Sequence, residues 1–352
     1  MDNEVKWPDY VGAGHVLDQA MNKVKEALYN KRADFLFGSG MSKSSKVPIG
    51  TELSVRLLEE FFPRASTSKP EETTLKSLAQ KYPLEVVAEA VKQMMGGEEK
   101  LTKSVEAVLF KNQKRDDDLY NLFSSICFLE GEPLVDQIFT TNFDCLFEED
   151  TGKKWVPIGI EDNEKLRKTK RREIPKIPVI HLHGLFKQRC IIAETDIFEQ
   201  KRVTNTSLME FEHVLANSDV FVFVGYSMSD PDIRAIYMRW RKNILGRKYG
   251  PNNEDTAVFV VSPPDNGFDY TVGSSMWGAR GALLIPLDAL SFFKKLKHFM
   301  VYESGSKKLE DLKDILKIED EAVLGDKVDR LARLLRVKKE DAIQFLFVAR
   351  SF

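Results

Sequence analysis

Cysteine is scarce in this chain, which has only Cys127, Cys145 and Cys190 among its 352 residues. An odd number of widely spaced cysteines is typical of a reducing compartment, and it excludes a zinc site with four cysteine ligands. Long apolar runs are also absent: no segment is long enough to cross a bilayer, and the N-terminus has no apolar signal region. We therefore expect a cytoplasmic protein without a membrane partner.

An excess of charge of one sign is missing as well. The chain has 52 basic and 54 acidic residues, so its overall charge gives no bias toward nucleic acids or membranes. The segment 165–172 is strongly basic, but a solvated segment explains such a run better than a nucleic-acid interface. Direct nucleic-acid binding is not expected.

Two common phosphate-binding signatures are incomplete, although a glycine loop is present. Gly38–Ser42 follows a short apolar run at 34–37 and precedes a helical pattern, a context in which glycines let backbone N–H groups approach a pyrophosphate. The dehydrogenase fingerprint requires a third glycine where Lys43 stands, and no Gly-Lys-Ser/Thr closes a P-loop. Since any tight turn from strand to helix can use Gly-Ser-Gly, the loop alone leaves nucleotide binding and a plain turn equally open.

Short runs rich in valine, isoleucine, leucine and phenylalanine alternate with helical segments along the chain. Such runs, closed by glycine, proline or polar residues, are typical of strands buried on both faces. Their alternation with helices predicts an α/β fold with a doubly wound, mostly parallel, Rossmann-like sheet. The predicted strands lie at residues 34–37, 134–140, 177–182, 220–224, 256–261 and 282–286.

The remaining segments define the expected domain organisation. Residues of about 64–132 have a helical pattern without a comparable strand, which predicts a helical insertion. We expect residues 1–290 to form one nucleotide-binding domain that contains this insertion. Residues 291–352 are charged, with leucines at helical spacing, and predict a helical C-terminal tail.

Polar residues directly follow three of the predicted strands. They are Thr140–Asp144, the pair His183-Gly184, and Gly225–Asp230. Parallel α/β sheets bind ligands at the carboxyl ends of their strands, so these side chains are expected to face a substrate. Together with the glycine loop, they indicate a nucleotide pocket that contains an amide and an imidazole.

Each of these strand ends also has a purely structural explanation. Asn142 and Asp144 can cap the turn that follows them. Ser229 or Asp230, followed by Pro231, can cap the helix 232–241, and this role can coexist with binding ribose. His181 and His183 alternate along one strand and should face opposite sides, which argues against a metal site shared between them. We expect one of them to be packed in the core, and His183, at the strand end, to be better placed for a ligand.

In chain order, these motifs resemble those of the sirtuin (silent information regulator) superfamily. That family has a Gly-x-Gly-x-Ser loop after its first strand, a Thr-x-Asn-x-Asp strand end, a His-Gly, a Gly-x-Ser and a late strand that closes the nucleotide site. The resemblance spans about residues 30–290, and the ordered set makes it specific. The corresponding segments look like Gly38–Ser42, Thr140–Asp144, His183-Gly184, Gly225–Ser227 and Val260–Pro263.

Two departures from the family pattern indicate a branch. Protein-deacylating sirtuins usually carry a four-cysteine zinc ribbon, which this chain cannot build. The acidic–aromatic–arginine segment that usually follows their glycine loop is also missing, since Pro48 precedes Ile49-Gly50-Thr51. The sequence is more similar to bacterial sirtuin-like proteins of antiphage defence, which hydrolyse NAD, and their Gly-Tyr-Ser-x-x-Asp motif looks like Gly225–Asp230.

This resemblance implies an NAD glycohydrolase that releases nicotinamide and ADP-ribose, with NAD as the substrate and no metal required. Asn142 would orient the nicotinamide ribose and the attacking water, and His183 would act as general base. The glycine loop would hold the pyrophosphate, while Ser227 and Asp230 would contact the adenosine side. The implied NAD-binding residues are Gly38, Ser39, Gly40, Ser42, Thr141, Asp144, Gly225, Ser227 and Asp230.

Two other functions remain open on the sequence. One is a zinc-free NAD-dependent protein deacylase, which would need an open peptide groove. The other is a non-catalytic module for nucleotide sensing or assembly, because a fold does not fix a function. The expected role is a gated NAD-depleting effector of bacterial antiphage defence, since constitutive depletion of NAD would be toxic. The expected partners are NAD, further copies of the chain in a homo-oligomer, and an ATPase or another defence-system protein.

Overall fold

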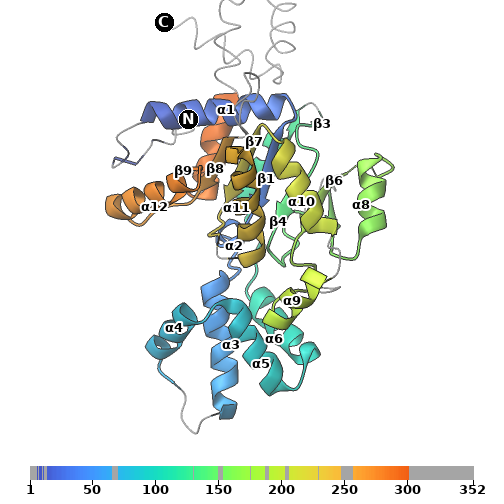
Figure 1. Cartoon of the computed structure of the whole chain (residues 1–352), viewed down its shortest axis with the longest axis vertical. Helices are drawn as coiled ribbons and strands as arrows, with labels where there is room; N and C mark the ends of the chain where they lie inside the picture. Colours follow the sequence, from blue (N-terminus) through green and yellow to red (C-terminus); the bar gives the residue numbers. More distant parts are fainter. Residues whose placement is uncertain are drawn as a thin grey trace, which may run out of the picture.

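A seven-stranded parallel sheet forms the centre of the structure, which is a computed structural model (Figure 1). It describes residues 6, 8, 9, 11 and 14–300, apart from 66–69, 130, 150–153, 175, 187–189, 203–205, 229 and 247–256. The strand order is β5-β6-β4-β1-β7-β8-β9, with β1 between the two halves, so the predicted doubly wound α/β sheet is confirmed. The strands are β1 (Ala33–Phe37), β4 (Ile138–Thr140), β5 (Trp155–Ile158), β6 (Ile177–His181), β7 (Val220–Val224), β8 (Ala257–Val261) and β9 (Leu283–Ile285).

The strands are apolar throughout because both faces of the sheet are covered by helices. Phe35 and Phe37 of β1 lie in the core on one face, whereas Leu36 between them lies in the core on the other. The first core also takes residues from α1 (Gly14–Tyr29), α7 (Asp117–Cys127) and the helical residues 289–300. The second takes residues from α10 (Thr206–Asn217), α11 (Pro231–Gly246) and α12 (Gly267–Ala279).

One strand of the sheet was not predicted from the sequence. The edge strand β5 pairs only with β6 and contains Pro157. A proline removes one ladder hydrogen bond, which is tolerated at an edge but argues against a strand in a sequence pattern. The predicted run 134–140 also shortens to Ile138–Thr140, and the segment before it includes a separate two-stranded pair of β2 (Phe128–Leu129) and β3 (Glu132–Pro133).

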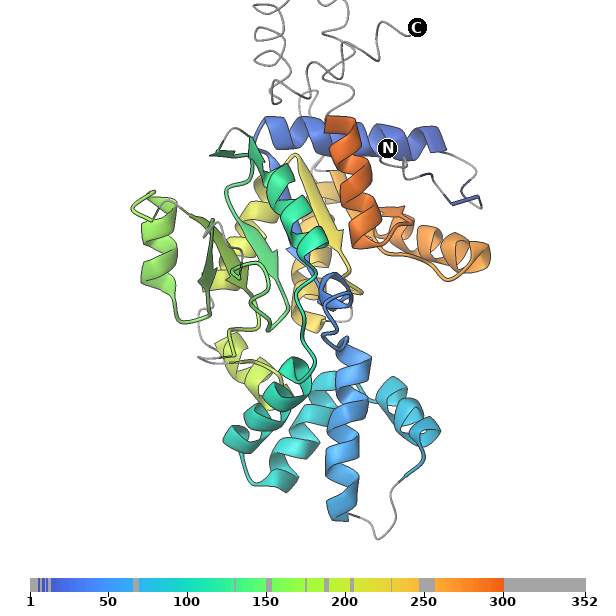
Figure 2. The same cartoon turned by 180° about the vertical axis from the view of Figure 1, so that it is seen from behind.

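Four helices form a module at the carboxyl edge of the sheet, while α1 lies across the opposite edge (Figures 1 and 2). Within the module, α3 packs against each of the other three helices. Helix α3 begins at Gly50, whereas the sequence predicted a helical insertion from about residue 64. Helix α7 is not part of the module, because its Phe123 packs against Phe35 and Phe37 of the sheet. The module consists of α3 (Gly50–Ala65), α4 (Glu72–Lys81), α5 (Leu84–Met95) and α6 (Glu98–Phe110).

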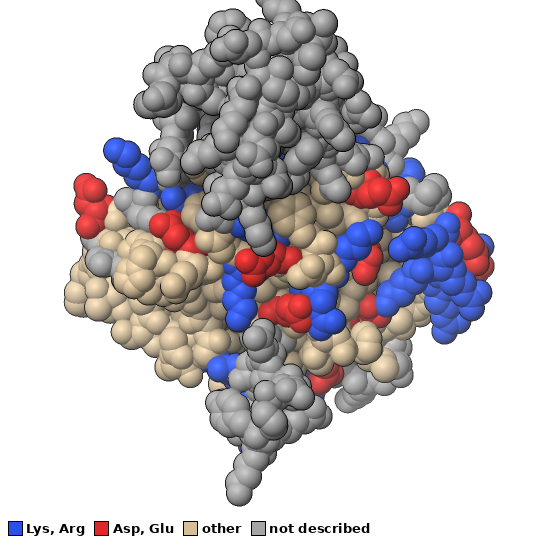
Figure 3. Space-filling model, turned by 90° about the horizontal axis from the view of Figure 1, so that it is seen from above, with Lys and Arg blue, Asp and Glu red and all other residues tan. Residues whose placement is uncertain are grey.

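Three shorter helices complete the described fold: α2 (Ser39–Ser42), α8 (Asn163–Lys170) and α9 (Glu194–Arg202). The basic residues around α8 gather on one side of the molecule (Figure 3), where Lys168 pairs with Glu164 at 2.9 Å. Of the predicted helical tail, residues 301–352 lie outside the described residues. Among the helices that the structure describes, none has both the length and the apolar character needed to span a membrane.

Candidate functional site

A cavity of about 1260 Å³ lies between the carboxyl edge of the sheet and the helical module. It exceeds the roughly 300–1,000 Å³ typical of pockets for drug-sized ligands, so its size suits an extended ligand such as a dinucleotide. Its position agrees with the rule that doubly wound sheets bind ligands where the strand order reverses. The predicted site residues that line it are Ser39, Gly40, Thr141, Asn142, Asp144, His183, Gly225, Ser227 and Asp230.

Asn142 extends from the end of β4 into this cavity and is held by several hydrogen bonds. Its backbone N–H donates to Thr140 Oγ1 at 3.0 Å, and its side-chain Nδ2 donates to Gly38 O at 3.1 Å and to Ser42 Oγ at 3.0 Å. The carbonyl of Gly38 can only accept, so this contact fixes which way the amide points. Within the described part of the chain, Asn142 Oδ1 accepts no hydrogen bond, and it remains available to a ligand hydroxyl or water.

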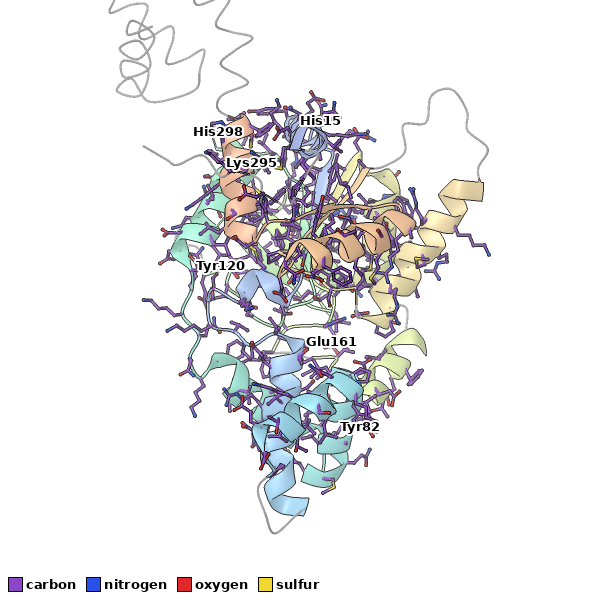
Figure 4. The ribbon with its side chains drawn as sticks, turned by 90° about the vertical axis from the view of Figure 1, so that its left-hand side faces the viewer. His15, Tyr82, Tyr120, Glu161, Lys295 and His298 are labelled. Carbon is purple, nitrogen blue, oxygen red and sulfur yellow. The ribbon has the colours of Figure 1, made fainter. Side chains whose placement is uncertain are left out.

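Ser42 lies beneath the cavity and does not line it. Its side chain is fully buried, and its Oγ donates to Asp144 Oδ2 at 2.7 Å while accepting from Asn142. Tyr120 on α7, which is labelled in Figure 4, completes this group, because its hydroxyl lies 3.2 Å from Ser42 Oγ. The structure therefore gives Ser42 a supporting contact with Asn142 and Asp144, in place of the direct phosphate contact expected from sequence.

Asp144 is buried beside Ser42, and burial raises the pKa of its carboxyl to about 6 even though the Ser42 hydrogen bond and His181 lower it. Its Oδ1 accepts the backbone N–H of Leu146 at 3.3 Å. The capping role that the sequence left open for Asp144 is therefore present. Its other oxygen is used by Ser42, so this carboxyl is committed to internal hydrogen bonds.

The glycine loop packs tightly against the end of β7. A Cβ atom at Gly40 would lie 2.7 Å from Gly225 Cα, and Gly225 itself has a φ of 62° in the left-handed region. The N–H of Gly38 donates to Val224 O at 3.0 Å, and that of Gly40 donates to Gly225 O at 2.9 Å. These two amides are thus already paired between the β1 and β7 loops. The glycines are explained by this close approach of two backbones, and Gly38 does not line the cavity.

His183 follows β6 at the cavity wall and contacts Asp230 through its Nε2. Asp230 also accepts the backbone N–H groups of Asp232 at 2.8 Å and Ile233 at 3.0 Å, which confirms its predicted role as a helix cap on α11. Burial would raise the pKa of Asp230, but His183 and the backbone donors outweigh it and keep this pKa below its usual value. For His183, burial lowers the pKa, but the Asp230 carboxylate has the larger effect, so the pKa of His183 lies above its usual value.

This pairing defines the tautomer of His183. An ionised carboxylate can only accept a hydrogen bond, so Nε2 of His183 carries a proton. In the neutral imidazole, Nδ1 is then the proton acceptor. The side chain of His183 is 22% exposed, which leaves the ring accessible from the cavity while its orientation is fixed.

His181 is the packed histidine of the pair, so the expectation that one of the two is packed is confirmed. The expectation that they face opposite sides of one strand was wrong, because residues two apart in a strand face the same side. The two rings are separated because β6 ends at His181 and His183 lies in the turn that follows. The side chain of His181 is fully buried, with Nδ1 2.9 Å from Asn142 O and Nε2 2.9 Å from Glu148 Oε1. It supports the backbone of Asn142 from the side away from the cavity. Glu148 and Tyr120 were both missed by sequence reasoning, because neither lies in a motif and their partners are distant in sequence.

Comparison with known proteins connects this site to one family. Residues 136–270 match the family model described as a SIR2-like domain, a match that covers less than half of the chain. The matched part contains Asn142, His183 and Asp230, so these residues lie in a segment that is similar to SIR2-like domains. Among curated proteins, none matches this chain.

Several solved Sir2 structures are similar in outline. One comes from work on the mechanism and regulation of Sir2 enzymes, with a TM-score of 0.43, 13% identity, and coverage of 80% of this chain and 98% of that chain. Sir2Tm bound to a propionylated peptide gives a TM-score of 0.37, 14% identity, and coverage of 84% and 99%. A Sir2 mutant with a p53 peptide and NAD gives a TM-score of 0.36 and 12% identity, and the match covers 81% of this chain and 99% of that chain. These TM-scores are below 0.5, so the likenesses assign no residue a role.

Proposed function

We propose that this chain is an NAD glycohydrolase, which cleaves the bond between nicotinamide and ribose and releases nicotinamide and ADP-ribose. The observation that carries the proposal is the convergence of Asn142 and His183, from the adjacent strands β4 and β6, on one cavity at the switch point of the sheet. The SIR2-like match of residues 136–270 adds support for an NAD-dependent enzyme.

The proposed chemistry needs mainly positioning, because nicotinamide is a good leaving group. As the glycosidic bond breaks, its electron pair leaves with nicotinamide, and the ribose develops an oxocarbenium-like centre. The Oδ1 of Asn142 would accept a hydrogen bond from a ribose hydroxyl or from the attacking water. Because Gly38 O and Ser42 Oγ already hold the other end of this amide, the acceptor is oriented before the substrate arrives.

His183 would complete the reaction as general base. The water oxygen forms a bond to the anomeric carbon, and its proton passes to Nδ1 of His183. The resulting imidazolium is stabilised by the Asp230 carboxylate at Nε2. Ser39, Thr141 and Ser227 line the same cavity and would bind the remaining polar groups of NAD.

Incubating the purified full-length chain with NAD tests this proposal directly. We expect release of nicotinamide without an acyl-lysine peptide, and loss of at least about 100-fold of this activity in His183→Ala and in Asn142→Ala, in line with the contribution of general acid–base catalysis and fixed dipoles. His15→Ala and Asn163→Ala are matched controls, since His15 lies on α1 and the exposed Asn163 begins α8, neither at the cavity.

The outcome separates the three candidate functions. Release that requires the acyl-lysine peptide would assign a deacylase, and tight NAD binding without turnover would assign a sensing module. Thermal unfolding of Asn142→Ala must be measured in parallel, because its amide also links the β1 and β4 loops.

We also propose that the activity is gated, as an NAD-depleting effector of bacterial antiphage defence would require. Assembly into homo-oligomers, or an ATPase or other defence-system partner, would supply the trigger. Expression of the wild-type chain and of His183→Ala in bacteria, with NAD measured in the cells, tests this. Full activity of a freely expressed monomer without growth arrest would contradict gating.

A further inference from the structure

A second cluster of reactive side chains lies behind the Asn142 backbone, outside the cavity. Cys145, Glu148 and His181 each offer one ligand atom, and these three atoms lie within 4.8 Å of one another. None of the three residues is among those that line the cavity. The cluster therefore needs an explanation separate from NAD binding.

Two structural elements bring these residues together. Cys145 begins a tight turn in which its backbone oxygen accepts the N–H groups of Glu148 and Glu149, both at 3.1 Å. A spacing of three residues in such a helical turn places Cys145 and Glu148 on one face. His181 ends β6 and pairs in register with Thr140, two residues before Asn142. The turn and the strand end thus meet beside the proposed catalytic amide.

The hydrogen bonds of His181 leave an electron pair directed at an acidic neighbour. Its Nδ1 lies 2.9 Å from Asn142 O, and because a carbonyl oxygen can only accept, Nδ1 must carry a proton. In the neutral ring Nε2 then has a lone pair, and it lies 2.9 Å from Glu148 Oε1. Two acceptors at this distance repel each other unless a cation lies between them, which is either a proton or a metal ion.

Glu148 supplies a second, independent observation. Its side chain is only 9% exposed, and within the described part of the chain its Oε2 is buried without a hydrogen-bond partner. Leaving a buried carboxylate oxygen unpaired destabilises the fold, because the oxygen loses its hydration and gains no donor. A proton on His181 satisfies Oε1 but leaves Oε2 unpaired, whereas a metal ion can take either or both oxygens.

We propose that Cys145, Glu148 and His181 bind a divalent transition metal, with zinc the best match. Thiolate, imidazole and carboxylate together form a ligand set that zinc accepts, at bond lengths of about 2.0–2.3 Å. The side chains would have to shift to place their ligand atoms at these lengths from one ion. The hydrogen bond from Nδ1 to a backbone carbonyl is the usual outer contact of a metal-binding histidine.

This site departs from the sequence-based expectation that the protein needs no metal. The cysteine count excluded a four-cysteine ribbon, but a mixed site with one cysteine was not tested by that argument. The metal would clamp the turn 145–149 to the end of β6 and so fix the backbone of Asn142. Its role would be to hold the proposed active site in place, without touching the substrate.

Metal binding by the full-length chain tests the proposal without any measurement of NAD turnover, so its result is independent of the proposed function. The protein is stripped with a chelator and dialysed against zinc, and bound metal is measured by mass spectrometry. We expect one zinc ion per chain. Replacement by Co²⁺ should give a thiolate-to-cobalt charge-transfer absorption, and zinc should raise the unfolding temperature.

Cys145→Ser and Glu148→Gln test the assigned ligands. Each should weaken zinc binding by more than about tenfold, and Cys145→Ser should abolish the thiolate-to-cobalt absorption. Cys190→Ser is the matched control and should behave as the wild type. Absence of stoichiometric zinc, or binding that survives both ligand variants, would overturn the proposal in favour of a protonated histidine–carboxylate pair. Should Glu148→Gln fail to fold, the half-buried Cys145 decides, because its substitution removes a ligand from a partly exposed position.

Discussion

The carboxylate of Asp230 contacts Nε2 of His183 with one oxygen and caps helix α11 with the other. This arrangement anchors the proposed general base to a helix N-terminus, whose partial positive charge helps to keep the carboxylate ionised. The backbone N–H groups at the start of α11 hold Asp230, and Asp230 in turn fixes the charge, the tautomer and the orientation of the His183 ring on the loop after β6. No such contact could be expected from residues 47 positions apart in the sequence.

Changing Asp230 to asparagine should shift the pH dependence of catalysis. The Asp230 carboxylate raises the pKa of His183 against the effect of burial, with smaller contributions from Asp232 and Glu85. A general base acts when neutral, so activity rises with pH through the pKa of His183. Asp230→Asn keeps a hydrogen-bond acceptor but removes the charge, and the acidic limb of kcat/KM should move to lower pH. We also expect kcat to fall about tenfold as imidazolium stabilisation is lost.

Nicotinamide release measured from pH 5 to 9 checks this expectation. Asp118→Asn is the control, because Asp118 is an exposed carboxylate in the first turn of α7 and its loss should leave the profile unchanged. An acidic limb that stays in place in Asp230→Asn would show that another group acts as the base.

Ser42→Ala should lower kcat and stability while leaving KM for NAD nearly unchanged. The hydroxyl of Ser42 accepts from Asn142 and donates to Asp144, but it does not line the cavity. Its removal takes the donor from Oδ2 of the buried Asp144 carboxyl, while Oδ1 keeps the N–H of Leu146, and this should destabilise the fold by about 1–3 kcal/mol. Denaturant unfolding and steady-state kinetics measure the two effects.

Ser125→Ala provides the comparison, because the exposed hydroxyl of Ser125 donates to the backbone carbonyl of Leu122 in its own helix. A large rise in KM with an unchanged kcat would instead support the original sequence-based expectation that Ser42 contacts the pyrophosphate.

The sheet was predictable because its strands are buried on both faces, which makes apolar runs such as Val220–Val224 stand out from their surroundings. The edge strand β5 was not, since it is short and contains Pro157. The packing of α3 (Gly50–Ala65) against the other helices of the module was also not predicted, because helical periodicity does not reveal whether a helix packs on the sheet or on other helices.

In the candidate site, too, some features could be predicted from the sequence and others could not. The position of His183 beyond the end of β6 sufficed to distinguish the ring at the cavity from the buried ring of His181. The supporting contacts could not be predicted, since Ser42 meets Tyr120 and Asp144 across 78 and 102 residues of sequence. Side-chain networks of this kind depend on tertiary packing, which motif spacing does not encode.

Gly40→Ala should destabilise the protein far more than Gly50→Ala. A Cβ atom at Gly40 would lie 2.7 Å from Gly225 Cα and 2.9 Å from Gly225 O, so the two strand exits would have to separate. Overpacking of this kind costs about 1–3 kcal/mol. At Gly50, by contrast, no other atom of the described residues that could clash lies within 4 Å of the added atom. Comparable unfolding free energies for the two variants would refute the packing role of the glycine loop.

Asp34 on β1 should make the unfolding free energy fall as the pH rises. Burial raises the pKa of this carboxyl from 3.8 to about 7, although the hydrogen bond from Ser218 Oγ at 2.7 Å lowers it, and Asp136 and Glu210 raise it further. A raised pKa in the folded state means that the stabilising contribution is complete below the unfolded pKa near 3.8 and is lost as the pH rises through about 7. The shift of about three pKa units sets an upper bound of roughly 4 kcal/mol.

Asp34→Asn has no charge to bury and still accepts from Ser218, so its unfolding free energy should fall less than that of the wild type between pH 4 and 8. Urea unfolding at intervals across this range measures the difference, with the exposed Asp118→Asn as the control for a general change in net charge. Parallel pH profiles of the wild type and Asp34→Asn would mean that Asp34 ionises as easily in the folded chain as in the unfolded one. A flatter profile for Asp34→Asn alone would assign the pH dependence to this single buried carboxyl, at the opposite end of β1 from the cavity.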